Sequence, residues 1–113
     1  MNVKSQDPTD VVIALIDRSI CAVQVAALCV DNMGIFAWAW NHMGFTGLGQ
    51  HAEAHCIIRA NRKRLVGATM YVAAKRARNN KIVTARPCAS CEPIVRVCRN
   101  VIYRNAEGDW VEL

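Results

Sequence analysis

Long hydrophobic runs are missing from this chain of 113 residues. Its apolar stretches are interrupted every few residues by Asp, Arg, Gln or Asn, so none reaches the roughly 20 apolar residues that a membrane-spanning helix requires. The first ten residues, MNVKSQDPTD, contain no apolar stretch and no small-residue cleavage site, and we therefore expect no export signal and a cytoplasmic location. Repeats, low-complexity tracts and linkers are also missing, which at this length predicts a single domain over residues 1–113.

Without an export signal, the six cysteines do not indicate a secreted disulfide framework. Four of them lie within apolar runs, where a reduced cysteine packs as a small hydrophobic residue: Cys21, Cys29, Cys56 and Cys98. The other two, Cys88 and Cys91, form a C-x-x-C pair after Pro87. In a reduced compartment that pair indicates metal binding or redox chemistry.

The net charge of +5 is unevenly distributed along the chain. Residues 1–58 carry two Lys or Arg against five acids, whereas residues 59–113 carry twelve against four. Such asymmetry indicates a phosphate-bearing partner, or else a solvated helix end and a charged hairpin.

Spacing of apolar residues predicts a helix followed by a β-hairpin in the first part of the chain. The sequence Asp7-Pro8-Thr9-Asp10 supplies a cap and an early proline for a helix over 8–19. Apolar runs on either side of a turn at residues 31–34 predict two antiparallel strands. A period of two in the second strand places Phe36, Trp38 and Trp40 on one face, and we expect the two tryptophans to pack as core against the first helix.

The rest of the chain alternates between helical and extended patterns. We expect helices over 51–64 and 88–99 and strands over 68–74, 101–105 and 109–113. In the first of these helices the apolar residues Ala54, Ile57, Ile58 and Leu65 are predicted to face the core. Since only Ala106-Glu107-Gly108 joins the last two strands, they must be antiparallel. This order predicts a three-layer α/β/α fold around a central mixed five-stranded sheet.

Two short motifs carry the chemistry. His51-Ala52-Glu53 begins one predicted helix, and Pro87-Cys88 with Cys91 begins another. One imidazole and two thiolates would hold a tetrahedral zinc ion with one open position, which is the arrangement of a catalytic site. Glu53, two residues from His51, can lie near the metal and move protons without binding it.

H-x-E followed by P-C-x-x-C resembles the cytidine deaminase superfamily, and the resemblance extends over nearly the whole chain. It implies one Zn²⁺ per chain held by His51, Cys88 and Cys91, with Glu53 as the catalytic proton shuttle. The activity it implies is hydrolytic deamination of a cytosine base in a nucleotide or nucleoside, which releases ammonia. The last two strands, antiparallel as in cytidine deaminases and in some compact phage-type deaminases, favour that compact group.

The same resemblance suggests which residues bind substrate. Asn41 would contact the sugar, backbone groups at Ala52 the edge of the base, and Arg86 a phosphate. Phe45 could stack on the base or fill the edge of the core. The Glu that follows this Asn by two residues in free-nucleoside deaminases is replaced by Met43 here, which argues against a nucleoside-only substrate.

Other function classes stay open at this point. The same chemistry could act on cytosine or adenine within single-stranded DNA or RNA, and a zinc-binding module without turnover is a further alternative that the presence of Glu53 argues against. We also expect a homo-oligomer and no membrane partner.

Residues 74–86 form an additional segment between a predicted strand and Pro87. A minimal deaminase does not need it, because there the strand leads directly to the P-C-x-x-C motif. The segment contains five cations and no acid, and it predicts two antiparallel arms that turn at Asn79-Asn80 and return beside Cys88. Cations at the mouth of the pocket would attract phosphate. The alternative is a solvated hairpin whose charges only protect an exposed sheet edge.

Overall fold

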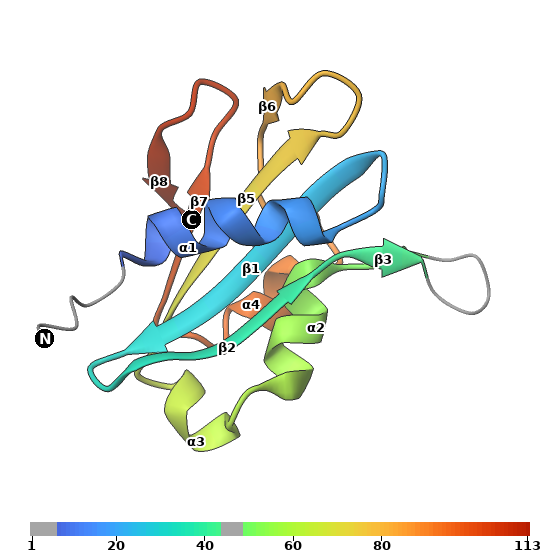
Figure 1. Cartoon of the computed structure of the whole chain (residues 1–113). Coiled ribbons are helices and arrows are strands. Elements are labelled where there is room, and N and C mark those ends of the chain that lie inside the picture. Colours follow the sequence, from blue (N-terminus) through green and yellow to red (C-terminus); the bar gives the residue numbers. More distant parts are fainter. Residues whose placement is uncertain (1–6, 44–48) are drawn as a thin grey trace, which may run out of the picture.

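Helices cover both faces of a mixed β-sheet in this chain, whose computed structural model describes residues 7–43 and 49–113 (Figure 1). The strands are β1 (Val23–Asp31), β2 (Gly34–Trp40), β3 (His42–Met43), β4 (Gly49–Gln50), β5 (Thr69–Arg76), β6 (Ile82–Val83), β7 (Asn100–Arg104) and β8 (Trp110–Glu112). The helices are α1 (Pro8–Leu15), the short 3₁₀ helix η1 (Ile16–Arg18), α2 (Ala52–Arg59), α3 (Arg62–Leu65) and α4 (Glu92–Val95). No described helix is long and apolar enough to cross a membrane.

The main sheet has the strand order β2-β1-β5-β7-β8, and β6 pairs with the end of β5. Among the described strands only β5 and β7 pair in parallel, while β7 and β8 form an antiparallel hairpin. One apolar cluster joins α1 to one face of the sheet, and a larger cluster joins α2, α3 and α4 to the other. The predicted three-layer fold with a mixed central sheet is therefore confirmed, with β6 as an additional short strand.

The first helix begins where its cap predicts. The Asp7 carboxylate accepts hydrogen bonds from the Thr9 backbone N–H at 2.9 Å and from the Thr9 hydroxyl at 2.7 Å. Val12 and Ile16 are fully buried against the sheet, and Trp40 packs beside them as predicted. Trp38 does not join this core, because it lies on the edge strand β2 and 45% of its surface is exposed.

A β-bulge in β2 places Phe36 on the face of the sheet opposite to the predicted one. Val30 pairs with Ile35 and Cys29 with Ala37, so Phe36 is an extra residue between two paired positions. The bulge turns Phe36 to the same side as Ala37, where both pack in the cluster beneath α2 and α3. An uninterrupted period of two would have placed Phe36 beside Trp38.

The predicted helix over 51–64 is broken into α2 and α3. Ala60 has an extended backbone, and the Asn61 side chain accepts a hydrogen bond from the Lys63 N–H at 3.0 Å, which starts a new helix. The face of α2 that is buried contains Ala52, Glu53 and Cys56, whereas Ile58 is 74% exposed, contrary to the prediction.

Because the helix breaks, α3 lies against the β1–β2 turn. The Arg64 guanidinium donates two hydrogen bonds of 2.7 Å to the Asp31 carboxylate, and its Cζ lies 4.2 Å from the centre of the Phe36 ring. This pairing lowers the pKa of Asp31 from its usual 3.8 to about 2.

We expect Asp31→Asn to destabilise the fold in a pH-dependent manner. The low folded-state pKa means that ionised Asp31 stabilises the fold above pH 4, and that this contribution disappears as the pH falls toward 2. Urea unfolding at several pH values would therefore show the wild type more stable at neutral pH, with the difference shrinking between about pH 4 and 2. Asp17→Asn is the control, because Asp17 is 71% exposed in its ion pair with Lys75 and should contribute little. Equal losses from both substitutions would contradict this account.

The segment after Pro87 forms less helix than predicted. Residues 88–91 make a turn, and α4 covers only Glu92–Val95 instead of 88–99. The backbone of Ala68 then accepts hydrogen bonds from Arg99 and Asn100, which ends the helical path and aligns β7 with β5. Cys88 and Cys91 thus lie in a tight turn before the helix, within which the Cys91 N–H bonds the Cys88 carbonyl at 3.0 Å.

The predicted antiparallel arms of residues 74–86 are present. Ala74 pairs with Val83 and Lys75 with Ile82, and Asn80 has a φ of +57° at the turn. Asparagine tolerates this left-handed conformation better than other non-glycine residues, which explains why the turn forms here. We call residues 74–86 the β5–β6 hairpin.

Candidate metal centre and its pocket

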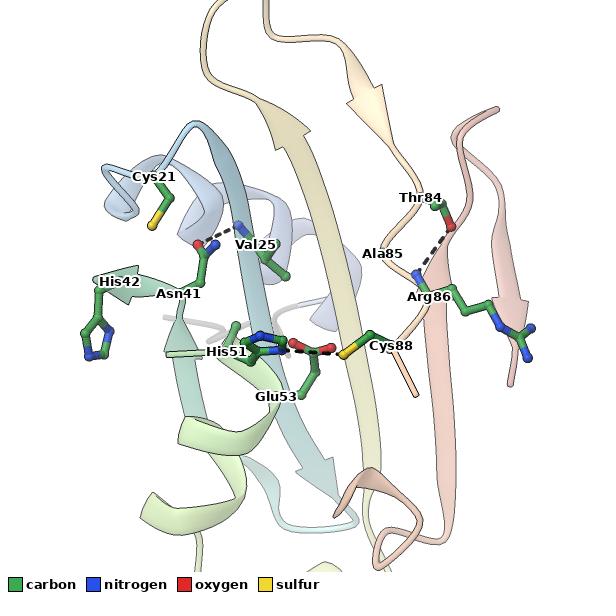
Figure 2. A pocket seen from close by; sticks show the side chains of 11 residues that line it. Cys21, Val25, Asn41, His42, His51, Glu53, Thr84, Ala85, Arg86 and Cys88 are labelled. Carbon is green, nitrogen blue, oxygen red and sulfur yellow. Dashed lines mark hydrogen bonds between the residues drawn. The ribbon is translucent and has the colours of Figure 1, made fainter. Parts of the chain in front are cut away.

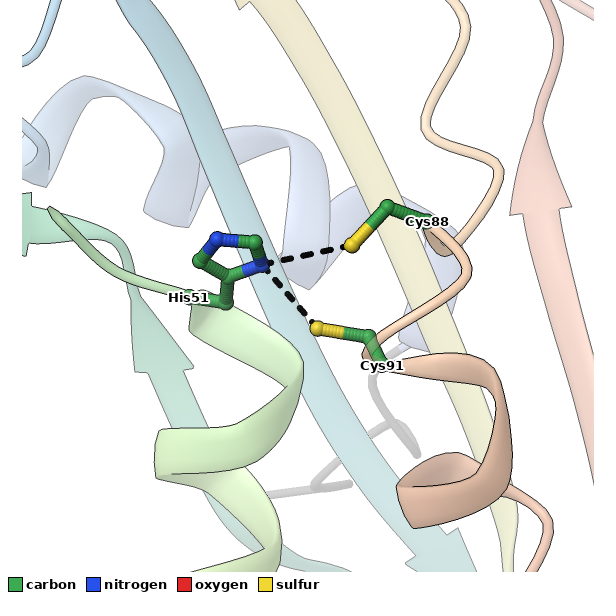
Figure 3. Close-up of side chains that lie close together, drawn as sticks. All are labelled: His51, Cys88 and Cys91. Carbon is green, nitrogen blue, oxygen red and sulfur yellow. Dashed lines mark hydrogen bonds between the residues drawn. The ribbon is translucent and has the colours of Figure 1, made fainter.

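His51, Cys88 and Cys91 converge at the start of α2 and at the turn before α4 (Figure 3). His51 precedes α2 with an extended backbone, and its Nδ1 lies 3.0 Å from the Cys91 sulfur and 3.7 Å from the Cys88 sulfur. One potential ligand atom from each residue lies within 4.8 Å of the other two. The structure therefore brings together the three residues that the two motifs contain, although 37 residues of sequence separate His51 from Cys88.

These donors fit a zinc ion. Nitrogen and sulfur ligands at zinc bonding distances in a tetrahedral arrangement are about 3.5 Å apart, close to the observed separations of 3.0 and 3.7 Å. Within the described ranges no other His, Cys, Asp or Glu joins this cluster. A three-residue donor set leaves one coordination position for water or substrate, as in catalytic zinc sites.

Electrostatics distinguish the two thiols. The pKa of Cys88 is lowered to about 7, first by its hydrogen bond with Ser90 and then by the backbone N–H groups of Cys91 and Ser90. Burial, and next the charge of Glu53, raise the pKa of Cys91 to about 12. A divalent cation at the three donors would favour both thiolates, because its charge offsets this cost.

A cavity of about 260 Å³ opens beside the cluster, between β1, the end of β2, the start of α2 and residues 84–88 (Figure 2). Its volume admits a single small ring system with part of a substituent. Glu53 lies at its base, with its carboxylate between His51 and Cys88 in the view of Figure 2.

Glu53 is the buried carboxylate of this pocket. It is the second residue of α2, and only 6% of its surface is exposed. Burial raises the pKa of Glu53, while its own backbone N–H and His51 act in the opposite direction. A carboxylate in this position can accept a proton from a molecule in the pocket and return it.

Three of the residues predicted to bind substrate line the cavity: Asn41, Ala52 and Arg86. Ala52 is fully buried and begins α2, so its backbone N–H has no partner within the helix. The Arg86 side chain points away from the cavity in Figure 2, toward Glu92 at 3.9 Å and the Tyr103 ring. Phe45 lies outside the described residues.

Asn41 also has a structural role that the sequence did not indicate. Its side-chain oxygen accepts hydrogen bonds from the Ser19 hydroxyl at 2.6 Å and the Val25 N–H at 2.9 Å, and its amide donates to the Val23 carbonyl at 2.8 Å. These bonds fix the start of β1 against the end of β2. One amide hydrogen is left for a molecule in the cavity.

Some lining residues were missed by the sequence analysis: Cys21, Val25, His42, Thr84 and Ala85. The alternation within β1 places Val25 on the face of Ala27 and Cys29, but only the contact of Val25 with Asn41 across the sheet shows that this point of the strand borders the cavity. Pairing between distant strands is not readable from one sequence, so this part of the wall required the structure.

Comparison with known proteins gives two findings. The family model of the cytidine and deoxycytidylate deaminase zinc-binding region matches residues 4–106. A crystal structure of cytidine deaminase from Burkholderia pseudomallei superposes with a TM-score of 0.68 at 17% identity, over 92% of this chain and 87% of that chain. At that identity the superposition shows a shared fold. Among curated proteins, no significant match is found.

Proposed function

The chain belongs to the cytidine and deoxycytidylate deaminase family, and from this membership we propose that it deaminates a cytosine base in a nucleotide or nucleoside. The family is zinc-binding, and the His/Cys/Cys cluster fits one zinc ion. The observation that carries the proposal is the position of Glu53, buried at the base of a cavity and beside the convergent His51, Cys88 and Cys91. We assign these three residues as the zinc ligands.

The reaction converts cytosine and water into uracil and ammonia. Zinc, when bound, supplies a Lewis acid that lowers the pKa of water toward neutrality. Glu53 accepts one proton from water as its oxygen attacks C4 of the base, and delivers that proton to the ring nitrogen, which keeps it in uracil. The second proton of the same water, now on the C4 hydroxyl, passes through Glu53 to the amino group, which leaves as ammonia. Burial restricts the motion of the Glu53 side chain, so its carboxylate is held at the base of the cavity.

Substrate is positioned by the cavity wall. The N–H of Ala52, free at the first turn of α2, would donate to the edge of the base, and the remaining amide hydrogen of Asn41 would donate to the sugar. Arg86 would reach a phosphate only after its side chain rotates away from Glu92. Such rotation is inexpensive because 58% of the Arg86 side chain is exposed.

One assay tests the proposed function. Zinc-loaded protein is incubated with cytidine, deoxycytidine, both 5′-monophosphates, a short cytosine-containing oligonucleotide and deoxyadenosine, and ammonia release is measured. We expect ammonia and the matching uracil compound from at least one cytosine substrate. Ammonia from deoxyadenosine alone would show that the protein deaminates adenine and not cytosine. No ammonia from any of these compounds, with zinc bound at one ion per chain, would show a zinc-binding module without turnover.

A further inference from the structure

The β5–β6 hairpin extends from the sheet above the cavity, and its cations are not equivalent. It contains Lys75, Arg76, Arg78, Lys81 and Arg86 and no acid. Residues 76–81 are all exposed. Lys75 forms an ion pair with Asp17, and Arg86 lies 3.9 Å from Glu92. Arg76, Arg78 and Lys81 form no ion pair with any described residue.

Strand register decides which way these cations face. Lys75 meets Asp17 of η1, on the α1 side of the sheet, so the next residue, Arg76, lies on the opposite face. That is the face of Ala74, which pairs across with Val25 in the cavity wall. Arg76 is therefore about 7 Å along β5 from Ala74, the partner of Val25, since two residues of a strand span this distance.

Lys81 lies on the same face as Arg76. The Arg76 N–H donates to the Lys81 carbonyl at 2.9 Å, which places the two residues across from one another near the turn. Val83, two residues after Lys81, packs into the cluster beneath the cavity side of the sheet. Arg76 and Lys81, neither in an ion pair with a described residue, thus lie on the cavity side of the sheet. Arg78, at the turn of the hairpin, lies farther from the cavity.

Exposed apolar residues lie at the start of β1, beside Arg76. Val23 pairs with Arg76 and is 43% exposed, and Ile20 is 89% exposed. The Ala77 N–H donates to the Ala22 carbonyl at 2.9 Å, which holds the hairpin against this segment. Cys21, between Ile20 and Ala22, lines the cavity itself. Apolar groups beside unpaired cations suit a ligand that combines flat bases with phosphates.

Protection of the sheet edge does not explain the charges. The edge strand β6 is only two residues long, Ile82 and Val83, and so offers little backbone for unwanted pairing. Arg78 lies outside the paired part of the hairpin, where a charge protects no strand.

We propose that the β5–β6 hairpin binds the phosphodiester backbone of a single-stranded nucleic acid, so that the deaminated base belongs to a polynucleotide. This inference rests on the proposed function. A mononucleotide carries its phosphate next to the sugar, within reach of the cavity wall. The three cations extend from Arg76 to the hairpin turn and can contact several phosphates at once, whereas a mononucleotide offers one; flanking nucleotides would supply the others.

Binding of thymidine oligonucleotides tests the inference without turnover, because thymine has no amino group to lose. Fluorescence anisotropy is measured with labelled strands of three and twelve thymidylates between 50 and 200 mM salt. We expect tighter binding of the longer strand. Three phosphate contacts predict a slope of about −2 for log K against log salt, so affinity should fall roughly fifteenfold over this range. Arg76→Ala/Arg78→Ala/Lys81→Ala should bind the twelve-mer weakly and with almost no salt dependence.

The control removes the same charge elsewhere. Arg62, Lys63 and Arg99 are exposed and lie near the starts of β5 and β7, at the opposite end of these strands from the hairpin. Their triple replacement by alanine should leave both affinity and slope unchanged. Equal losses in the two triple variants, or unchanged binding in the hairpin variant, would overturn the inference.

Deamination assays distinguish a failure of this inference from a failure of the proposed function. On a strand with one cytosine among thymidylates, we expect the hairpin variant to lose at least tenfold in kcat/KM, with deoxycytidine turnover unchanged. Wild-type protein that deaminates deoxycytidine but neither binds nor deaminates the strand would overturn the inference alone. A loss confined to deoxycytidine 5′-monophosphate would also overturn it, in favour of a site for one phosphate. Hairpin-dependent binding with no deamination of any cytosine compound would overturn the proposed function and leave the hairpin site standing.

Discussion

Glu53→Gln is expected to reduce turnover by at least roughly a hundredfold while zinc content and fold are retained. Proton transfer by a positioned side chain contributes about 10²–10⁴-fold to an enzymatic rate, and a hundredfold corresponds to about 2.7 kcal/mol of barrier. Glutamine keeps the size and position of the side chain but cannot accept the proton of water. Among the residues that line the cavity in the described part of the chain, Glu53 is the only carboxylate, so no neighbour can replace it.

Steady-state deamination, zinc content and thermal unfolding of the same preparation check this expectation. Glu92→Gln is the matched control, because Glu92 is a partly exposed carboxylate at the start of α4 that pairs with Arg96 and should not affect kcat. Glu53→Ala should be at least as damaging as Glu53→Gln. If the alanine variant keeps more than about a tenth of the activity at full zinc content, the proton passes through another group. The role assigned to Glu53 would then be wrong.

The candidate site was largely predictable because its chemistry is encoded in short spacings. His51 and Glu53 are two residues apart, and Cys88 and Cys91 three, so local backbone geometry alone keeps each pair together. Resemblance to a known family joined the two pairs, and the structure brings them together as that resemblance implies. The hairpin turn at Asn79-Asn80 was predictable for a similar reason, since asparagine favours the backbone conformation that the turn needs.

Features that depend on tertiary contacts were not predictable. The bulge at Phe36 depends on the pairing of β2 with β1, and the Phe36 ring is held by Arg64, a residue 28 positions later, through a contact of 4.2 Å. The break at Ala60 costs helical hydrogen bonds, which the Asn61 cap and the Arg64 pair with Asp31 offset. Apolar periodicity also assigned the wrong face to α2: its buried face contains Ala52, Glu53 and Cys56, so Ile58 faces solvent.

The same limit applied to the hairpin cations. The sequence shows five positive residues, but not that Lys75 meets Asp17, which lies 58 residues earlier. Only the register of β5 divides the cations between the two faces of the sheet. That division made it possible to select Arg76, Arg78 and Lys81 as the test set and to leave Lys75 intact.

Cys88→Ser and Cys91→Ser are expected to abolish stoichiometric zinc binding and to lower stability by the free energy that zinc contributes. The ligands come from two segments that are far apart in sequence, so an ion that holds them together binds the folded chain much better than the unfolded chain. At zinc a thousandfold above its dissociation constant, this linkage amounts to about 4 kcal/mol. For a domain of this size the corresponding change in Tm is on the order of 10 °C.

Metal analysis and thermal unfolding, each with and without a chelator, separate loss of zinc from loss of packing. The Tm of the wild type should fall when a chelator removes zinc. The two variants should already unfold near that lower temperature, and their Tm should not change with the chelator. Cys91 is 3% exposed, so a serine hydroxyl there adds a small packing cost that persists without zinc, while exposed Cys88 should show the zinc effect alone. Cys21→Ser is the control: Cys21 lines the same cavity but lies outside the donor cluster, and its replacement should leave zinc content at one ion per chain. Full zinc content in Cys88→Ser would show that the metal is held by other ligands, and the assignment of the whole centre would then be wrong.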